Sequence, residues 1–590
     1  MRRGVILIFL LLSTSTSIAT ARQQTQPAQG PAQGEVPIVL PPRVGVDAGA
    51  PLFLTLAEAI KLTLEQNNDV VVARLDQDAS RQDIRAAEGV FDPRFVPMLS
   101  YQKTVSASAS AIGGAVNGRL EQDQVVGALG VDSRAPWAGG RFAVDFTSTR
   151  IESSNQFARL NPQFPSALTA SYIQPLSRGR TIDAERRQIE LARRAADLTD
   201  SQLTQVLMDQ LTLVEQAYWD VVFAVRSLEV QTTALAQAQS QVASNERQAR
   251  EGTLAPIDVV EAQIQASNFR QNVALAQQAL TEAENRLKRL MLASRDAPQW
   301  RQPIVPSEVV DLPPPSASLE EAVRLALARR PELGALEATR AQNDVDRQFY
   351  SDQAKPQLDL VGTYTLSGLA GSALQSSTPI DSGSSDAALL ARLNQLSERA
   401  GLVPLPVPAP SGGSSVPPFL VGSYGSSLDN LFSRRYPTAI VQLQMELPLG
   451  NNTARANLAR TQIVSNQIAR QRQQLEQTIE SEVRNTLQAV QSTQQRLEAA
   501  TSARRNALEQ YESERRRFDS GLSTVFLVLE RQTALVSAQA RELRARADVN
   551  QAVALLERAI GGTLDRHKVK VTGGGQTSGA IHPDNESRQR

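Results

Sequence analysis

The longest regular pattern in the chain is a stripe of apolar residues inside residues 181–250, a run without proline or glycine. Apolar side chains recur there at alternating spacings of four and three, which is the heptad pattern of a helix that packs along another helix. At 1.5 Å per residue, these 70 residues would form a helix about 105 Å long. The stripe consists of Leu207, Leu211, Val214, Tyr218, Val221, Val225 and Leu228.

A second, interrupted stripe follows the same spacing in residues 483–511. Glycines stand after both runs, at Gly252 and Gly521, and glycine readily takes the left-handed conformation that ends a helix. We therefore predict that each long helix folds back on a shorter one as an antiparallel hairpin, ending near Leu292 and Ile560. The second stripe comprises Val483, Leu487, Val490, Leu497, Leu508 and Tyr511, with polar Gln494, Thr501 and Arg504 between them.

Between the predicted helices, short segments alternate apolar and polar residues, as β-strands do. Residues 141–149 place Phe142, Val144 and Phe146 on one face. Segments of about ten such residues are typical of transmembrane β-barrels, and a soluble β-sandwich is the alternative. Nine aromatic residues between positions 91 and 172 favour the barrel, because aromatic girdles line its membrane borders. Five more strands are predicted around residues 95–101, 125–131, 168–172, 358–366 and 439–449.

The lengths of the connections predict an orientation for these strands. Residues 136–140 read as a tight turn on the inner side of the membrane, and the polar segments 106–124 and 152–166 as longer outer loops. Residues 368–436 form a long insertion rich in Gly, Ser and Pro, with a short helix expected at 387–399. Six strands are too few for a barrel, whereas three copies would provide 18 strands and a water-filled lumen.

The order of elements occurs twice along the chain, as expected for an internal repeat. Residues 56–60 and 319–323 each open a predicted helix of roughly 35 residues. We therefore divide the chain into a repeat at 52–295, a Pro-rich linker at 296–318 and a second repeat at 319–562. The other matching pairs are 174–176 with 447–449 and 252–263 with 521–532.

The N-terminus has the pattern of an export signal. Arg2 and Arg3 precede an apolar run at residues 5–12, and Ala19-Thr20-Ala21 fits a cleavage site, so residues 1–21 are predicted to be a signal peptide. The alternative, a membrane anchor, would need about 20 apolar residues. Residues 22–51 read as a flexible Pro/Gln-rich lead-in and 563–590 as a polar tail.

Composition excludes several classes of chemistry. The 590 residues include no cysteine and only two histidines, His567 and His582, both in the predicted tail. Disulfides, thiolate metal sites and a lipid anchor on cysteine are therefore excluded, and a histidine relay or metal core is not expected. The 61 basic and 61 acidic residues balance, which argues against a nucleic-acid partner. We expect no enzyme activity, cofactor or metal.

These features, in this order and twice over, resemble the TolC-type outer-membrane efflux and secretion channels across residues 52–562. The resemblance implies a mainly α fold with transmembrane β: a trimeric β-barrel in the outer membrane that continues into a long periplasmic α-helical barrel. It also implies a passive exit duct without an enzymatic role, working in tripartite efflux or type I secretion with a periplasmic adaptor and an energised inner-membrane transporter. A periplasmic coiled-coil scaffold or adaptor is the alternative, although an adaptor normally has one hairpin. The motifs are Leu56/Ala59 with Leu319/Ala322, Gln174-Pro175-Leu176 with Arg178-Gly179, and Arg517-Phe518-x-x-Gly521 with Leu529-x-x-Gln532.

The resemblance also implies functional positions at the hairpin turns. The adaptor-contacting tips would be Gly252, Thr253 and Leu254 in the first repeat, and Gly521, Leu522 and Ser523 in the second. Carboxylates that line the closed entrance would fall on Asp258, Leu527 and Glu530, and latch partners on Phe518 and Ser523, which lack the usual hydroxyl and charge. Three copies of Glu530 would favour cations at a narrow mouth. Alternatively, Asp258 and Glu530 are only solvated charges of a helix surface. The transported substrate cannot be read from these residues.

Overall fold

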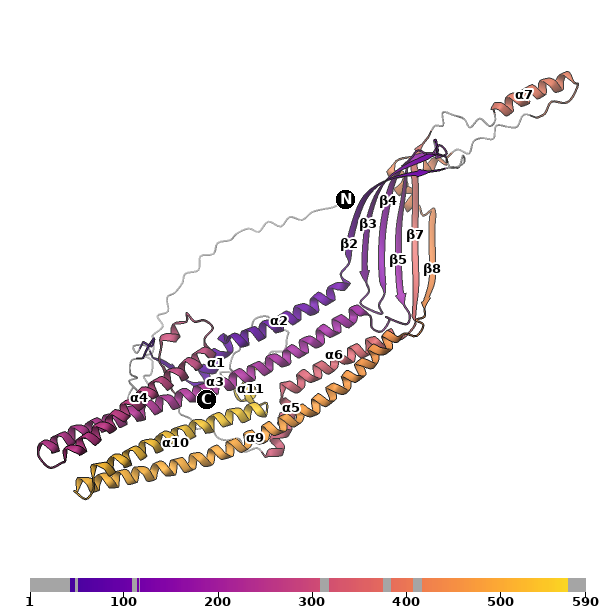
Figure 1. The fold of residues 1–590 in the computed structure, drawn as a ribbon. Helices are drawn as coiled ribbons and strands as arrows, with labels where there is room; N and C mark the ends of the chain where they lie inside the picture. Colours follow the sequence, from indigo (N-terminus) through magenta and orange to yellow (C-terminus); the bar gives the residue numbers. More distant parts are fainter. Residues whose placement is uncertain are drawn as a thin grey trace, which may run out of the picture.

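A layer of long helices meets a six-stranded sheet at one end of the molecule (Figure 1). The predicted signal peptide, nearly all of the lead-in and most of the tail lie outside the residues that the structure describes. The computed structural model describes residues 43–47, 51–108, 114–115, 117–307, 318–374, 384–406 and 416–570.

The sheet is antiparallel throughout and contains the six predicted strands, in the order β2-β3-β4-β5-β7-β8. Its register places the predicted apolar positions on one face, because Phe146 lies opposite both Leu129 and Leu168. Polar residues occupy the other face, where Asp145 pairs with Thr169. The strands are β2 (Arg94–Ala107), β3 (Arg119–Arg134), β4 (Arg141–Ser153), β5 (Leu160–Pro175), β7 (Gln357–Ala373) and β8 (Tyr436–Glu446).

Both edges of the sheet are open in the protomer. Every residue of β2 and of β8 is exposed to solvent. A long unpaired strand presents a row of free backbone donors and acceptors, which invites another strand to add to it. The sheet therefore closes only when further copies pair with β2 and β8.

The outer connections are shorter than predicted. The strands continue into the segments 106–124 and 152–166 that were expected to be loops: β2 ends at Ala107 and β3 begins at Arg119, and β4 ends at Ser153 and β5 begins at Leu160. Charged cross-strand pairs hold these polar strand ends, for example Lys103 Nζ to Glu121 Oε2 at 3.5 Å. These strand ends are polar on both faces, so they lack the alternation of apolar and polar residues that predicts a strand. The tight turn after β3 is confirmed by a hydrogen bond from the Ala135 N–H to the Gly140 oxygen, 2.7 Å.

The described part of the long insertion between β7 and β8 contains two α-helices. Helix α7 (Ser384–Arg399) begins three residues before the predicted one, and α8 (Tyr424–Phe432) was not predicted. Between them, η4 (Pro418–Leu420) leads into Val421, which bridges to Gly371, four residues past the last pair between β7 and β8.

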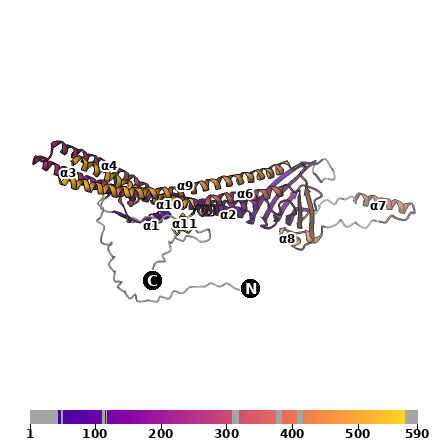
Figure 2. The same cartoon turned by 90° about the horizontal axis from the view of Figure 1, so that it is seen from below.

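Two helices of 67 and 68 residues run along the helical layer, and shorter helices pack beside them (Figures 1 and 2). Next to the sheet the helices contact one another in the order α2-α3-α6-α9, and farther away in the order α4-α3-α10-α9. The predicted pair of antiparallel hairpins is thus present as α3–α4 and α9–α10. These helices are α2 (Asn68–Glu88), α3 (Ala184–Arg250), α4 (Pro256–Met291), α6 (Pro331–Gln353), α9 (Asn452–Asp519) and α10 (Val525–Ala559).

The heptad stripe of α3 forms the largest apolar cluster of the protein. All seven of its predicted residues are buried, and Tyr218 also donates a hydrogen bond to the Leu54 oxygen at 3.2 Å. Of the six apolar residues of the predicted stripe in α9, only Val483 and Val490 are buried, because polar residues interrupt the stripe. The first hairpin therefore has the stronger core.

The helices that open each repeat are broken, contrary to the prediction of one helix of roughly 35 residues. Helix α1 (Leu56–Gln66) ends where Asn67 caps α2, with its side-chain oxygen accepting from the N–H groups of Asp69 and Val70. In the second repeat, α5 (Leu319–Arg329) ends because Pro331 starts α6 and disfavours a helical residue before it.

The described residues of the predicted lead-in, linker and tail pack at the middle of the helical layer, next to the start of the first repeat. Strand β1 (Leu52–Leu54) pairs in parallel with β6 (Ile304–Pro306), inside the predicted linker after η3 (Pro298–Arg301). Arg43 forms an ion pair with buried Glu284 at 2.8 Å. Helix α11 (Thr563–Arg566) and Val569 pack back on the helices. Buried contacts distant in sequence order these segments, so local composition does not reveal them.

Candidate functional site: the hairpin tips

The two hairpin tips are built in the same way. Gly252 and Gly521 have φ angles of 76° and 74°, the left-handed region where glycine is favoured. The Thr253 N–H donates to the Gln248 oxygen at 3.0 Å, and the Leu522 N–H to the Arg517 oxygen at 2.8 Å. These bonds satisfy carbonyl groups that a helix end would otherwise leave open. Both turns thus follow from their glycines.

A small apolar cluster joins the two hairpins just behind the tips. Ala262 of α4 packs with Val525 and Leu529 of α10, and Leu254 and Phe518 add partly buried side chains. Phe518, predicted as a latch partner without a hydroxyl, therefore contributes an apolar contact. Leu254, predicted as a tip residue, lies half-buried, whereas Thr253 and Leu522 are exposed.

Neutral polar contacts continue this junction away from the tips. The Gln265 Nε2 donates to Thr533 Oγ1 at 2.7 Å, and the Gln532 Nε2 to Gln237 Oε1 at 3.3 Å. In the described residues 230–269 and 514–540, no ion pair links the two hairpins. The tips are thus held together by small apolar and uncharged contacts, whose free energy is modest.

The predicted entrance positions differ in their surroundings. Asp258 is half-buried in the first turn of α4, where its negative charge interacts favourably with the positive end of the helix dipole. Its backbone oxygen accepts a hydrogen bond from Nδ2 of Asn245 at 3.2 Å. Asn245 is fully buried, and the sequence did not single it out. Leu527 is half-buried, and its N–H donates to Thr524 Oγ1 at 3.4 Å. Glu530 is exposed on α10.

The second tip contains an internal polar cluster that the sequence reasoning also missed. The Ser523 hydroxyl donates to the Glu514 carboxylate, and Arg517 Nη1 lies 3.6 Å from the other oxygen of that carboxylate. Ser523 was predicted as a latch position lacking charge, and in the structure it stabilises its own turn through this hydrogen bond. The spacing of Glu514 and Arg517, three residues apart on a helix, could have indicated their pairing.

Charged residues join the repeats at the middle of the layer. Arg558 of α10 donates to Asp209 of α3 at 2.6 Å and to Glu482 of α9 at 2.7 Å. Beside it, burial raises the pKa of the Glu557 carboxyl, an effect that Arg566 partly opposes. These contacts tie both hairpins to one rigid region far from the tips.

The described residues contain no group of three or more His, Asp or Glu side chains suited to a metal ion. Nor does the described part of the chain include a helix that is long and apolar enough to cross a membrane. What the site offers is a pair of exposed turns at the end of long, rigid helices.

A comparison with known families identifies the family of the protein. Residues 146–291 and 420–562 match the family model described as outer membrane efflux protein, once in each repeat. The chain belongs to the outer membrane efflux protein family. Each matched part contains one complete hairpin and lies within one of the two predicted repeats of this efflux protein.

Solved outer-membrane channels share the fold of this efflux protein at low sequence identity. CmeC of Campylobacter jejuni is 14% identical with a TM-score of 0.56, covering 86% of each chain. VceC of Vibrio cholerae is 14% identical with a TM-score of 0.54, covering 86% of this chain and 96% of its own. The open-state MtrE channel of Neisseria gonorrhoeae is 15% identical with a TM-score of 0.52, covering 86% and 89%. No curated protein matches the sequence.

The predicted family and architecture are therefore confirmed. This outer-membrane protein has the fold of channels in which a β-barrel continues into a periplasmic α-helical barrel, with two structural repeats in each chain. In such barrels the apolar face of the strands meets the lipid and the polar face lines the lumen.

Proposed function

We propose that the protein is a passive exit duct of a tripartite efflux or type I secretion system. One observation carries this proposal: the sheet, apolar on its outer face, leads directly into helices of up to 68 residues, about 100 Å at 1.5 Å per residue. In a trimer, this arrangement forms one continuous tube from the periplasm to the outside. A periplasmic scaffold or adaptor would not need a lipid-facing sheet.

The lumen follows from the number of strands. Each chain supplies six strands, so three copies supply 18. Barrels of 16–18 strands leave an aqueous channel. The polar residues on the inner face, such as Thr169 and Thr365, whose hydroxyl oxygens are 3.1 Å apart, suit such a wet interior.

Partner recognition is assigned in this proposal to the two tips. A periplasmic adaptor would contact Gly252, Thr253 and Leu254 in one hairpin and Gly521, Leu522 and Ser523 in the other. Support comes from the exposure of Thr253 and Leu522 at the far ends of the hairpins. The energy for transport would come from an inner-membrane transporter, which also selects the substrate.

The entrance is assigned to the region just behind the tips. Phe518 would hold the second hairpin against the first, and opening would separate the cluster that it joins. Glu530 is exposed and would contribute one negative charge per chain to the mouth. Asp258 and Leu527 would lie at the entrance without forming a polar latch.

Conductance measurements test the duct. The purified trimer, inserted in a planar lipid bilayer, should carry ionic current, and cysteines placed at 253 and 522 should crosslink to a co-expressed periplasmic adaptor. Recovery as a soluble periplasmic monomer would refute the proposal, as would a trimer that inserts without conducting. A trimer that conducts but never crosslinks would refute only the assignment of the tips.

A further inference from the structure

Helix α8 is seated firmly on the outer end of the sheet. The hydroxyl oxygens of Ser427 and Ser166 are 2.7 Å apart, and the Asn430 Nδ2 donates to the Leu369 oxygen at 2.9 Å. A Cβ atom on Gly368 would lie 2.3 Å from the Ser427 oxygen, so glycine allows the close approach. These contacts fix which side of α8 faces the sheet and which side faces away.

The seat of α8 is on the lipid-facing side of the barrel. Ser166 and Gly368 are paired, and each stands two residues from the apolar pair Leu168 and Leu366 on the same face. From Leu358 to Leu366 this face spans eight residue steps, about 26 Å along the strand at 3.3 Å per step. With the usual tilt, the apolar band is about 20 Å tall, so α8 lies at the outer border of the membrane.

The free side of this element is aromatic. Phe432 is 66% exposed and Tyr424 42% exposed, although both belong to a well-packed helix. Phe419, just before α8, is also exposed. Aromatic side chains with one apolar and one wet side concentrate at the interface between lipid tails and headgroups.

Two arginines follow directly after α8. Arg434 has a φ angle of 54°, a strained value for a residue with a side chain, and the Arg435 guanidinium lies 4.5 Å from the centroid of the Phe419 ring. Within the described residues, neither arginine forms an ion pair with a carboxylate. The Arg435 guanidinium is therefore held next to the aromatic surface without a carboxylate partner, and Arg434, its neighbour in the chain, adds a second charge without one.

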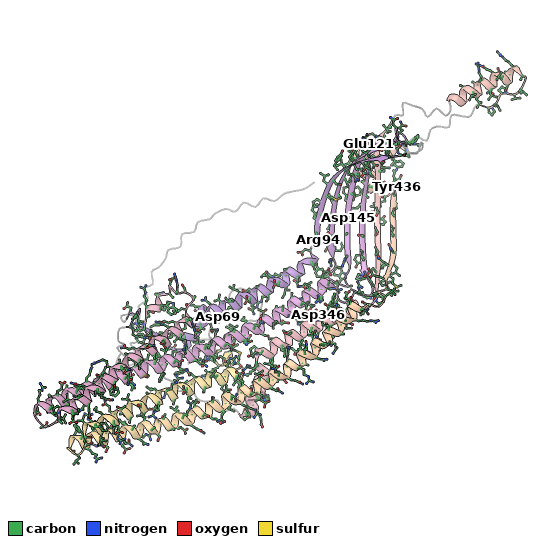
Figure 3. All side chains as sticks on the ribbon, in the orientation of Figure 1. Asp69, Arg94, Glu121, Asp145, Asp346 and Tyr436 are labelled. Carbon is green, nitrogen blue, oxygen red and sulfur yellow. The ribbon has the colours of Figure 1, made fainter. Side chains whose placement is uncertain are left out.

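Other basic residues at this rim have partners. Lys103 and Arg119 each contact Glu121, at 3.5 and 2.5 Å, and Arg150 pairs with Glu152. Figure 3 shows Glu121 at the outer end of the sheet, with Tyr436, the residue after Arg435, at the outer end of β8. The unneutralised positive charge in this part of the rim is thus concentrated after α8.

We propose that α8 and the two arginines that follow it bind a phosphorylated glycolipid of the outer leaflet. Arg434 and Arg435 hold the headgroup phosphate, since planar guanidinium groups donate paired hydrogen bonds to phosphate oxygens. Phe432 and Tyr424 lie along the acyl chains. A lipid is the occupant, and not a soluble anion, because the charged and aromatic parts meet at the height where a headgroup meets its chains. This inference rests on the membrane position of the sheet and not on the proposed export role.

The amount of lipid that the purified trimer retains tests this site. The variant Arg434→Ala/Arg435→Ala should carry at least about fivefold less bisphosphorylated lipid A per trimer, quantified by mass spectrometry after extraction in mild detergent. Arg434→Lys/Arg435→Lys should restore a large part of it. The matched control is Arg392→Ala/Arg399→Ala, which removes two exposed charges from α7 and should leave the lipid content unchanged.

Further arms separate the lipid from other occupants. Gly368→Ala should displace α8 and lower lipid A binding, although both arginines remain. Inorganic phosphate at 10 mM, about ten times the dissociation constant of a typical weak anion site, should not displace the lipid. Displacement would show that the site binds a free anion. Equal lipid in wild type and the double alanine variant overturns the proposal. So does loss of trimer stability in Phe432→Ala with unchanged lipid, which would assign the aromatic face to a second copy of the chain.

Discussion

Replacing Phe518 by alanine removes the largest side chain from the cluster that joins the two hairpin tips. The cluster contains only small or aliphatic partners, Ala262, Val525 and Leu529 among them. Truncating a fully buried phenylalanine costs about 3–5 kcal/mol, and Phe518 is only half-buried. We therefore expect Phe518→Ala to lower the free energy of separating the tips by about 2 kcal/mol, which raises the population of separated tips roughly 30-fold.

Amide hydrogen exchange on the purified trimer measures this separation directly. Peptides covering residues 258–266 and 525–533 should exchange about ten- to thirty-fold faster in Phe518→Ala, whereas peptides of α3 around Tyr218 should keep their protection. In planar bilayers the same variant should spend more time in its higher-conductance state.

Leu522→Ala provides the matched control. This residue belongs to the same tip and is 73% exposed, so its truncation should change the free energy by no more than about 0.5 kcal/mol. If Leu522→Ala accelerates exchange as much as Phe518→Ala, the tip as a whole is sensitive and the cluster has no special role. Unchanged exchange in Phe518→Ala would refute the reasoning outright.

Three other substitutions address charge, pH and backbone. Glu530→Gln should reduce cation selectivity, measured as a smaller reversal potential in a salt gradient, and an unchanged potential would remove Glu530 from the pore. Burial raises the pKa of Glu557 above its ordinary 4.5, so the folded protein keeps this proton while the unfolded chain loses it. Wild type should therefore lose stability relative to Glu557→Gln between pH 4 and pH 7, and a thermal-melting difference that does not change with pH would contradict this. Gly252→Ala should destabilise the first tip by about 1–2 kcal/mol through its φ of 76° alone, since a Cβ there would touch nothing within 4 Å. Limited proteolysis at residues 250–256 should accelerate, whereas Gly425→Ala, where φ is not positive, should have no such effect at the tip.

The periodic parts of this fold were predictable from the sequence because periodicity is a local property. Seven apolar residues at heptad spacing specify a helix with one buried side, and all seven are buried in α3. Alternation specified the six strands, and the order of the pattern indicated the repeat. Gly252 and Gly521 located both turns, since few other residues take their conformation.

Some local signals were present and were overlooked. Asn67 is a strong helix cap, and Pro331 restricts the residue before it, yet both stood within stretches that looked continuously helical. The outer strand ends were missed for a different reason. Lys103 of β2 and Glu121 of β3 are polar residues at the outer ends of their strands, where alternation no longer distinguishes a strand from a loop.

Only the tertiary structure decided which surfaces meet. Phe518 could be read as a latch position without its hydroxyl, and its role in an apolar junction depends on Ala262, 256 positions earlier in the chain. The same holds for His567, which belonged to a polar tail by composition and in the structure contacts buried Glu215. Spacing along one helix determines what that helix buries, whereas its partner is determined by packing among all the segments, which no single stretch of sequence contains.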